Sequence, residues 1–223
     1  MFNFNISDIK AVVFDWDNTL AQSSPPLVYA VNEVLKDFHL PCWEIVKAKR
    51  DRDLSFRDNF PRIFGQNADQ AYRTYKNIYL KIAPQMISRT PFAAEVLNYF
   101  KKRGIPILLM TNKDRELLEF ELPILFDPEY FDCIVCGHEA MQDKPHGDHL
   151  FYTLNKCPLS QNICMKDVLV VGDSPQDSAC ALACGAKAVR IGKSSFDELN
   201  LQNEDIIYFD SFVDFYESLL LSS

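Results

Sequence analysis

Short runs of apolar residues recur along the chain, and within each run apolar residues follow one another without alternating with polar ones. Runs of about 4–8 residues are typical of β-strands, and their continuity indicates strands covered on both faces, as in a parallel sheet. Each run therefore predicts a buried strand. The predicted strands cover residues 11–14, 105–110, 133–136, 168–171, 187–191 and 206–209.

Helical patterns lie between these strands. Residues 92–102 place their apolar positions on one side of a helix, and Gly104 follows as a stop signal. Ser174 and Pro175 supply an N-cap and a first-turn proline for another helix, which Gly185 would end. Alternating strands and helices predict an α/β fold with a doubly wound, mostly parallel, Rossmann-like sheet.

The stretch from residue 21 to residue 89 has a different pattern. It shows helical spacing and many charges, and it contains no convincing buried strand. We interpret it as a helical insert after the first strand, with Pro25, Pro26 and Pro91 as plausible hinge points. The expected domains are an α/β core of residues 1–20 and 90–223 and a helical cap of residues 21–89.

The composition is that of a globular protein, with 48% apolar residues and a net charge of -8. An acidic chain is a poor partner for nucleic acid or an anionic membrane surface, so neither is expected to bind. No apolar run approaches the roughly 18 residues of a membrane span, and the first residues show no signal-peptide pattern. These features predict a cytoplasmic protein.

The seven cysteines are scattered and odd in number, which favours free thiols in a reducing compartment. Cys133 and Cys136 form a CxxC motif, but they bracket a predicted strand. Residues three apart on a strand point to opposite faces. We therefore expect these two thiols to pack in the core and not to chelate a metal together.

Polar side chains follow three of the predicted strands at the point where each strand ends. In open α/β sheets, ligands bind outside the carboxyl ends of the strands, so these side chains should converge on one crevice. They are Asp15 and Asp17 after the first strand, Thr111 and Asn112 after the second, and Asp173 and Asp177 after the fourth.

The crevice would hold four carboxylates, which repel one another unless a cation lies among them. Hard oxygen ligands select Mg²⁺, usually together with water and a substrate phosphate. Thr111 and Asn112 offer hydrogen-bond donors for phosphate oxygens, and Lys144 adds a positive charge. The sequence therefore predicts a magnesium site that binds a phosphorylated substrate.

Four motifs in this order resemble those of the haloacid dehalogenase superfamily. They are DWDNT at residues 15–19, TN at 111–112, KP at 144–145 and GDSPQD at 172–177. The chain looks most similar to the phosphatase branch with a helical cap, the phosphoglycolate-phosphatase-like group. Each motif alone is a weak signal, whereas all four at these spacings are specific.

The resemblance implies a covalent mechanism. Asp15 would attack phosphorus and become an aspartyl phosphate, and Asp17 would act as general acid and then as general base. Thr111 and Asn112 would hold the phosphoryl oxygens. Lys144 would neutralise charge between Asp15 and the phosphate.

The resemblance also implies the magnesium ligands. Asp15, Asp173 and the backbone carbonyl of Asp17 would bind Mg²⁺, and Asp177 would support it. The family usually has glycine where this chain has Asn18. Asparagine tolerates a left-handed backbone, so we expect the tight loop to be kept.

The insert carries a run of basic residues interleaved with acidic ones. One interpretation is an exposed, ion-paired helix face, and the other is a surface that meets an anionic substrate. The sequence leaves both open, and it lacks the glycine that relatives have near Arg50. The residues are Lys47, Lys49, Arg50, Arg52 and Arg57, with Asp51, Asp53 and Asp58 between them.

The predicted activity is hydrolysis of the phosphate monoester of a small metabolite, by a monomer or small homo-oligomer. A phosphosugar mutase of the same fold would share every catalytic residue, so it remains an alternative. A receiver-type signalling domain is less favoured, because it would place its paired acids and its phosphorylated aspartate on separate strands. A non-catalytic binding module is also less favoured, because it would not need the complete set of acids. His146 and His149 could suggest a metal pair, but their position after Pro145 favours a solvated first helical turn.

Overall fold

The computed structural model describes residues 6–51, 54–192 and 206–222. Its centre is a six-stranded sheet in the order β5-β4-β1-β6-β7-β8, and every strand pair in it is parallel. The predicted α/β fold is thereby confirmed. The strands are β1 (Ala11–Phe14), β4 (Ile107–Met110), β5 (Cys133–Val135), β6 (Val168–Gly172), β7 (Lys187–Ile191) and β8 (Ile206–Phe209).

Strand β1 lies in the middle of the sheet, and its side chains alternate between two apolar layers. Val12 and Phe14 belong to one buried cluster, whereas Ala11 and Val13 belong to another on the opposite face. Neighbouring strands β4 and β6 pair with β1 on its two sides, so the direction of winding changes at β1. In such sheets this switch point is where a crevice opens at the carboxyl ends of the strands.

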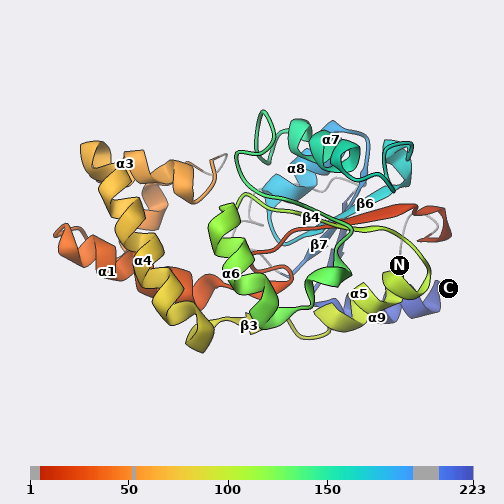
Figure 1. Cartoon of the computed structure of the whole chain (residues 1–223), viewed down its shortest axis with the longest axis horizontal. Coiled ribbons are helices and arrows are strands. Elements are labelled where there is room, and N and C mark those ends of the chain that lie inside the picture. The colour runs from red at the N-terminus through yellow and green to blue at the C-terminus, as the bar shows by residue number, and fades with distance from the viewer. Residues whose placement is uncertain (1–5, 52–53, 193–205, 223) are drawn as a thin grey trace.

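Helices cover both faces of the sheet, as Figure 1 shows. Helices α5 (Ala93–Lys102) and α9 (Phe212–Leu221) pack against the face of Val12, and α7 (Gly147–Lys156) and α8 (Pro175–Ala183) pack against the face of Val13. Helix α6 (Arg115–Leu125) adds Leu118 and Leu122 to the first of these layers. Burial on both sides explains why the strands read as continuous apolar runs.

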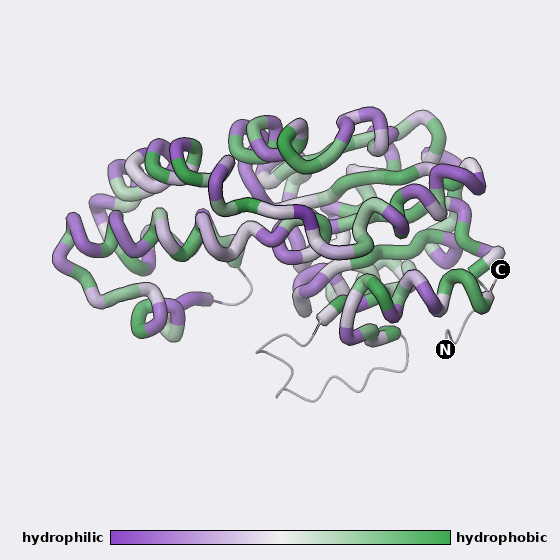
Figure 2. Tube along the Cα trace, turned by 90° about the horizontal axis from the view of Figure 1, so that it is seen from below, coloured by the Kyte–Doolittle hydropathy of each residue, from purple (hydrophilic) through white to green (hydrophobic). Residues whose placement is uncertain are grey.

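Residues 23–51 and 54–87 form a second group of helices beside the sheet, which we call the helical lobe (Figure 1). It has its own apolar core, with Val31, Phe60, Tyr75 and Tyr79 buried in it, and Leu117 of α6 packs into that core. Figure 2 shows apolar and polar residues alternating around these helices. The helices are α1 (Ser24–Asp37), α2 (Trp43–Val46), α3 (Phe60–Phe64) and α4 (Ala68–Met86).

An antiparallel ribbon of two short strands joins the helical lobe to the core. Strand β2 (Ala21–Gln22) pairs with β3 (Ser88–Arg89), so both chain crossings lie side by side. Neither strand was predicted from the sequence, because two residues are too few to show a period. Short 3-10 turns occur at Ile6–Asp8, Lys47–Lys49, Arg57–Asn59, Gly65–Asn67, Pro128–Tyr130 and Met165–Asp167.

Each cysteine is a free thiol, as expected. Cys133 packs into the layer with Val13, whereas Cys136 packs into the layer with Phe14, so the two sulfurs of the CxxC motif lie on opposite faces. Within the described residues, no helix combines the length and the apolar composition that crossing a bilayer would require.

Candidate active site

The predicted site residues converge at the carboxyl ends of β1, β4 and β6. Lys144, from the loop between β5 and α7, lies at their centre and is almost fully buried. Its ammonium group is 2.5 Å from Asp15 Oδ1 and 2.6 Å from Asp177 Oδ1, and it donates to the carbonyl oxygen of Met110 at 3.0 Å. Burial opposes the charged form, but the two carboxylates raise the pKa of Lys144 above its ordinary value. Lys144 is therefore a permanent cation inside the site.

Three acids face one another around this cation. Carboxylate oxygens of Asp15, Asp173 and Asp177 all lie within 4.8 Å of one another. Burial raises the pKa of Asp15 to about 7, the nearby Asp177 adds to this, and Lys144 partly opposes it. Burial and then the charges of Asp15 and Asp177 raise the pKa of Asp173 well above its usual range. One ammonium group does not balance these acids, and a hard divalent cation fits their donor set.

Local hydrogen bonds orient the acids. Asp177 forms a capping box at the start of α8, where its Oδ2 accepts from Ser174 N at 3.0 Å and from Ser174 Oγ at 2.6 Å. A Cβ at Gly172 would lie 2.3 Å from the Asp177 carboxylate, so only glycine fits there. The hydroxyl of Thr19 donates to Asp15 Oδ2 at 3.1 Å. Asn18 has a φ of 60°, the left-handed backbone expected for this loop.

Thr111 and Asn112 also lie at the site, but they are already engaged. The hydroxyl oxygen of Thr111 accepts from Lys113 N at 3.2 Å. The side-chain amide of Asn112 donates to Lys144 O at 2.8 Å and accepts from Lys144 N at 3.0 Å. This double contact holds the Lys144 backbone in place. Phosphate binding by the two residues stays a prediction.

His149 differs from the expectation of a solvated helical turn, which was wrong for this residue. It is fully buried, and its Nδ1 accepts from Lys144 N at 3.3 Å. The exposed His146 does face solvent. On α7 the buried positions are His149, Leu150, Thr153 and Leu154. This helical spacing was the signal that could have predicted a buried histidine.

A buried charge cluster that the sequence did not predict lies beside Asp17. Lys113 Nζ lies 2.6 Å from Asp17 Oδ1 and 2.8 Å from Glu121 Oε1. Trp16 Nε1 donates to Glu121 Oε2 at 2.6 Å. Glu121 occupies an apolar-face position of α6, between Leu118 and Leu122. A charged residue in such a position indicates a buried, paired side chain.

Arg57 of the helical lobe reaches two of the loops at the site. Its guanidinium group forms ion pairs with Asp58, with Asp114 after β4, and with Asp143 next to Lys144. Its side chain is only 13% exposed. Arg57 is therefore not part of a solvated helix face, and its charge is already paired with carboxylates of the protein. It bridges the helical lobe and the core.

The other basic residues of the insert have separate environments. Arg50 is half-buried, with its guanidinium carbon 5.5 Å from the ring centre of Trp43 and 5.7 Å from that of Phe56. Lys47 is exposed and pairs with Glu44 at 2.5 Å. Outside the described residues lie Arg52, Asp53 and the side chain of Lys49.

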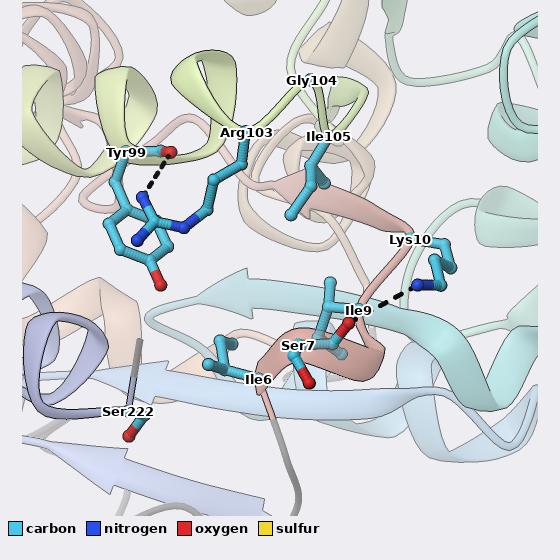
Figure 3. A pocket seen from close by; sticks show the side chains of 9 residues that line it. All are labelled: Ile6, Ser7, Ile9, Lys10, Tyr99, Arg103, Gly104, Ile105 and Ser222. Carbon is cyan, nitrogen blue, oxygen red and sulfur yellow. Dashed lines mark hydrogen bonds between the residues drawn. The ribbon is translucent and has the colours of Figure 1, made fainter.

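A separate pocket, drawn in Figure 3, lies at the opposite end of the sheet. Ile9 and Lys10 line it directly before β1, and Gly104 and Ile105 line it before β4. Asp15 and Thr111 follow the other ends of the same two strands. This pocket is therefore distinct from the cluster of acids.

The buried His149 should make folding stability depend on pH. Burial, and then the charge of Lys144, lower the pKa of His149 from 6.5 to about 3. Between these values the unfolded chain binds a proton that the folded chain excludes, so stability is full above pH 6.5 and is lost as the pH falls. The loss is about 1.4 kcal/mol per pH unit.

We expect His149→Asn to reduce this dependence, because asparagine does not titrate and its oxygen can still accept from Lys144 N. The measurement is urea unfolding at pH 7 and pH 5, and His146→Asn at the exposed neighbour is the matched control. An unchanged slope in His149→Asn would show that this histidine does not set the acid limit.

Comparisons with known proteins agree with this arrangement. The model of the haloacid dehalogenase-like hydrolases matches residues 12–191. Phosphoglycolate phosphatase of Escherichia coli (strain K12) is 26% identical over 234 residues, covering 90% of this chain and 89% of that protein. The relative of the same name from Pectobacterium atrosepticum is 24% identical, covering 94% and 92%.

Solved structures share the fold. CbbY from Rhodobacter sphaeroides in complex with phosphate has a TM-score of 0.76 at 18% identity, covering 92% of this chain and 96% of that one. A predicted phosphoglycolate phosphatase from Haemophilus somnus 129pt has a TM-score of 0.75 at 22% identity, covering 95% and 98%. The family match spans most of the chain and includes the strands that carry the clustered acids. The chain therefore belongs to the haloacid dehalogenase-like hydrolase family and is a phosphatase of that family.

Proposed function

We propose that this phosphatase is a magnesium-dependent phosphomonoesterase that acts on a small phosphorylated metabolite through an aspartyl phosphate on Asp15. The observation that carries the proposal is the position of Asp15. Its carboxylate follows the central strand, 2.5 Å from the Lys144 ammonium and within 4.8 Å of the carboxylates of Asp173 and Asp177. A nucleophile so placed has a cation beside it and donor oxygens for a metal around it.

In the first step, an oxygen of Asp15 would attack phosphorus while Asp17 protonates the departing oxygen of the substrate. In the second step, Asp17 would accept a proton from water as that water attacks the aspartyl phosphate. Lys144 would neutralise negative charge between Asp15 and the phosphoryl group. Thr111 and Asn112 would contribute donors to the phosphoryl oxygens, Thr111 through its hydroxyl proton.

The acids fit a magnesium ion. Asp15, Asp173 and the backbone carbonyl of Asp17 would hold it, with Asp177 supporting them from the start of α8. The contacts of Asp177 favour this supporting role, because Lys144 and Ser174 occupy its two oxygens. Bound magnesium would offset charge on the transferring phosphoryl group. The raised pKa values of Asp15 and Asp173 support the need for such a cation.

Residues 21–89 would act as a cap domain over a core of residues 1–20 and 90–223. Three contacts support this, because each joins the helical lobe to a loop or to a first helical turn at the site: Arg57 to Asp114, Arg57 to Asp143, and Gln176 Nε2 to Leu54 O at 3.2 Å. A closed cap would exclude water during phosphoryl transfer. The enzyme would work in the cytoplasm, as a monomer or small homo-oligomer.

The substrate class is inferred from the relatives. The relatives from Shigella boydii and Escherichia coli are named phosphoglycolate phosphatase, and a mutant of CbbY has been solved with xylulose-(1,5)bisphosphate. All of these ligands are small phosphorylated carbon compounds. A screen of phosphoglycolate, sugar phosphates and nucleotides, with and without Mg²⁺, would identify the substrate, and release of inorganic phosphate would separate a phosphatase from a mutase.

Asp15→Asn should abolish turnover, because asparagine has nearly the same shape but is not a nucleophile. The wild type should lose activity when Mg²⁺ is chelated and regain it when Mg²⁺ is restored. Phosphate release is the measurement, and circular dichroism checks folding. A folded Asp15→Asn variant that turns over at the wild-type rate would rule out the covalent mechanism.

Asp17→Asn should keep magnesium binding and lose rate by about 10²- to 10⁴-fold. The backbone carbonyl survives the substitution, whereas the proton-transfer group does not. Titration calorimetry with Mg²⁺ and steady-state kinetics at saturating Mg²⁺ separate these effects. Equal rates in variant and wild type would remove Asp17 from the acid role, and a loss of affinity alone would make it a ligand only.

Arg57→Gln should raise KM for large and small phosphate esters alike. The substitution leaves Asp58, Asp114 and Asp143 without their shared cation, so repulsion should weaken cap closure. The control is Arg62→Gln, because Arg62 pairs with Asp51 at 2.6 Å within the helical lobe and is 53% exposed. A rise in KM confined to one large anionic substrate would instead indicate that Arg57 grips the substrate.

A further inference from the structure

The buried cluster around Lys113 contacts two consecutive residues, Trp16 and Asp17. The carboxylate of Glu121 accepts from Trp16 Nε1 through one oxygen and pairs with Lys113 through the other. Lys113 in turn holds Asp17 Oδ1 at 2.6 Å. Two consecutive side chains of the loop that follows Asp15 are thus hydrogen-bonded to the ion pair between Lys113 and Glu121.

Burial makes this arrangement rigid. The side chain of Lys113 is 5% exposed and that of Glu121 is fully buried. A buried ammonium group has no water to replace a lost partner, so it stays where its carboxylates are. Glu121 provides a counter-charge that does not take part in the proposed reaction, so Lys113 remains paired when Asp17 gains or loses a proton.

The carboxylate of Asp17 is different, because it is partly open. Its side chain is 32% exposed, and Oδ1 is the oxygen that Lys113 binds. Among the described residues, no group forms a hydrogen bond with Oδ2, which is left to exchange a proton. A carboxylate on an exposed loop would otherwise rotate about its side-chain bonds, and fixing one oxygen restricts the position of the other.

Lys113 also touches the helical lobe. Its ammonium group donates to Tyr79 Oη of α4 at 3.4 Å and lies 5.1 Å from the centre of the tyrosine ring. Tyr79 is fully buried in the core of that lobe. Asp17, the helical lobe and α6 therefore meet at a single side chain.

We propose that Lys113 is the positioning residue of the general acid–base group Asp17, holding Oδ1 so that Oδ2 serves the leaving group and then water. The inference rests on the proposed phosphatase mechanism and deepens it. As the bond from phosphorus to the leaving oxygen breaks, the Asp17 proton passes to that oxygen and the alcohol departs. When water attacks the aspartyl phosphate, Asp17 takes a proton from it, and inorganic phosphate and the Asp15 carboxylate are released.

The test uses the chemistry of the leaving group. An alkyl or phenyl ester needs protonation of its departing oxygen, whereas 2,4-dinitrophenol leaves as an anion without help. The values of kcat/KM for phenyl phosphate and 2,4-dinitrophenyl phosphate report on the first phosphoryl transfer to Asp15. A loss of positioning should slow the first ester far more than the second, and a general loss of structure should slow both equally.

Lys113→Met should lower kcat/KM for phenyl phosphate by about 10²-fold or more, in the range expected for general acid catalysis. The value for 2,4-dinitrophenyl phosphate should fall by less than about tenfold, and Asp17→Asn should show the same pattern. The matched control is Lys76→Met. Lys76 lies on the same helix as Tyr79 and pairs with Glu116 of α6 at 2.5 Å, but it makes no contact with Asp17.

Lys113→Met alone would leave Glu121 buried without its cation, and folding could fail. The double variant Lys113→Met/Glu121→Gln removes both charges with little change in shape, and the glutamine oxygen can still accept from Trp16. It should show the same dependence on the leaving group. Urea unfolding verifies that both proteins are folded.

Equal losses for the two esters in a folded variant, or no loss for either, would overturn the role of Lys113. Failure of the proposed function would look different. In that case the wild type would hydrolyse neither ester with Mg²⁺, or Asp15→Asn would remain active, before any Lys113 variant is compared.

Discussion

The contact between Lys144 and Asp15 is the interaction on which the rest of the site depends. Three acids converge at the end of the central strand, and Lys144 is the cation that lets Asp15 and Asp177 lie so close together in a buried place. The protein holds this lysine from the backbone side, through the Asn112 amide and the His149 ring. Asn112, which is also a proposed phosphate contact, and His149, which the sequence placed in solvent, therefore both hold the backbone of this lysine.

Charge pairing also sets how the helical lobe meets the core. Arg57 reaches Asp114, Lys76 reaches Glu116, and Lys113 of the core touches Tyr79 of the lobe. The pair of Lys76 and Glu116 is partly exposed and contributes little stability, whereas the contacts of Arg57 and Lys113 are buried, so separating them would leave charges without partners.

Much of the fold and of the candidate site could be predicted from the sequence, because both signals are local. A continuous apolar run indicates a doubly covered strand, and the polar residues that follow it lie at one edge of the sheet. The structure brings Asp15, Asp173 and Lys144 together as this argument expects. The ribbon of β2 and β3 was missed, because two-residue strands have no period to detect.

The sequence by itself determined the sheet, the helices around it and three of the four acids that it predicted to cluster, since these follow from periodicity and from the order of strand ends; the carboxylate of the fourth, Asp17, pairs with Lys113. Only the tertiary structure decided the partners of the other charged groups. Lys113 and Asp17 are 96 residues apart, and Arg57 and Asp143 are 86 apart. His149 and Glu121 lie on the buried, mostly apolar faces of their helices, yet both make polar contacts there. Pairing across such separations depends on how packed elements face one another, which no local pattern encodes.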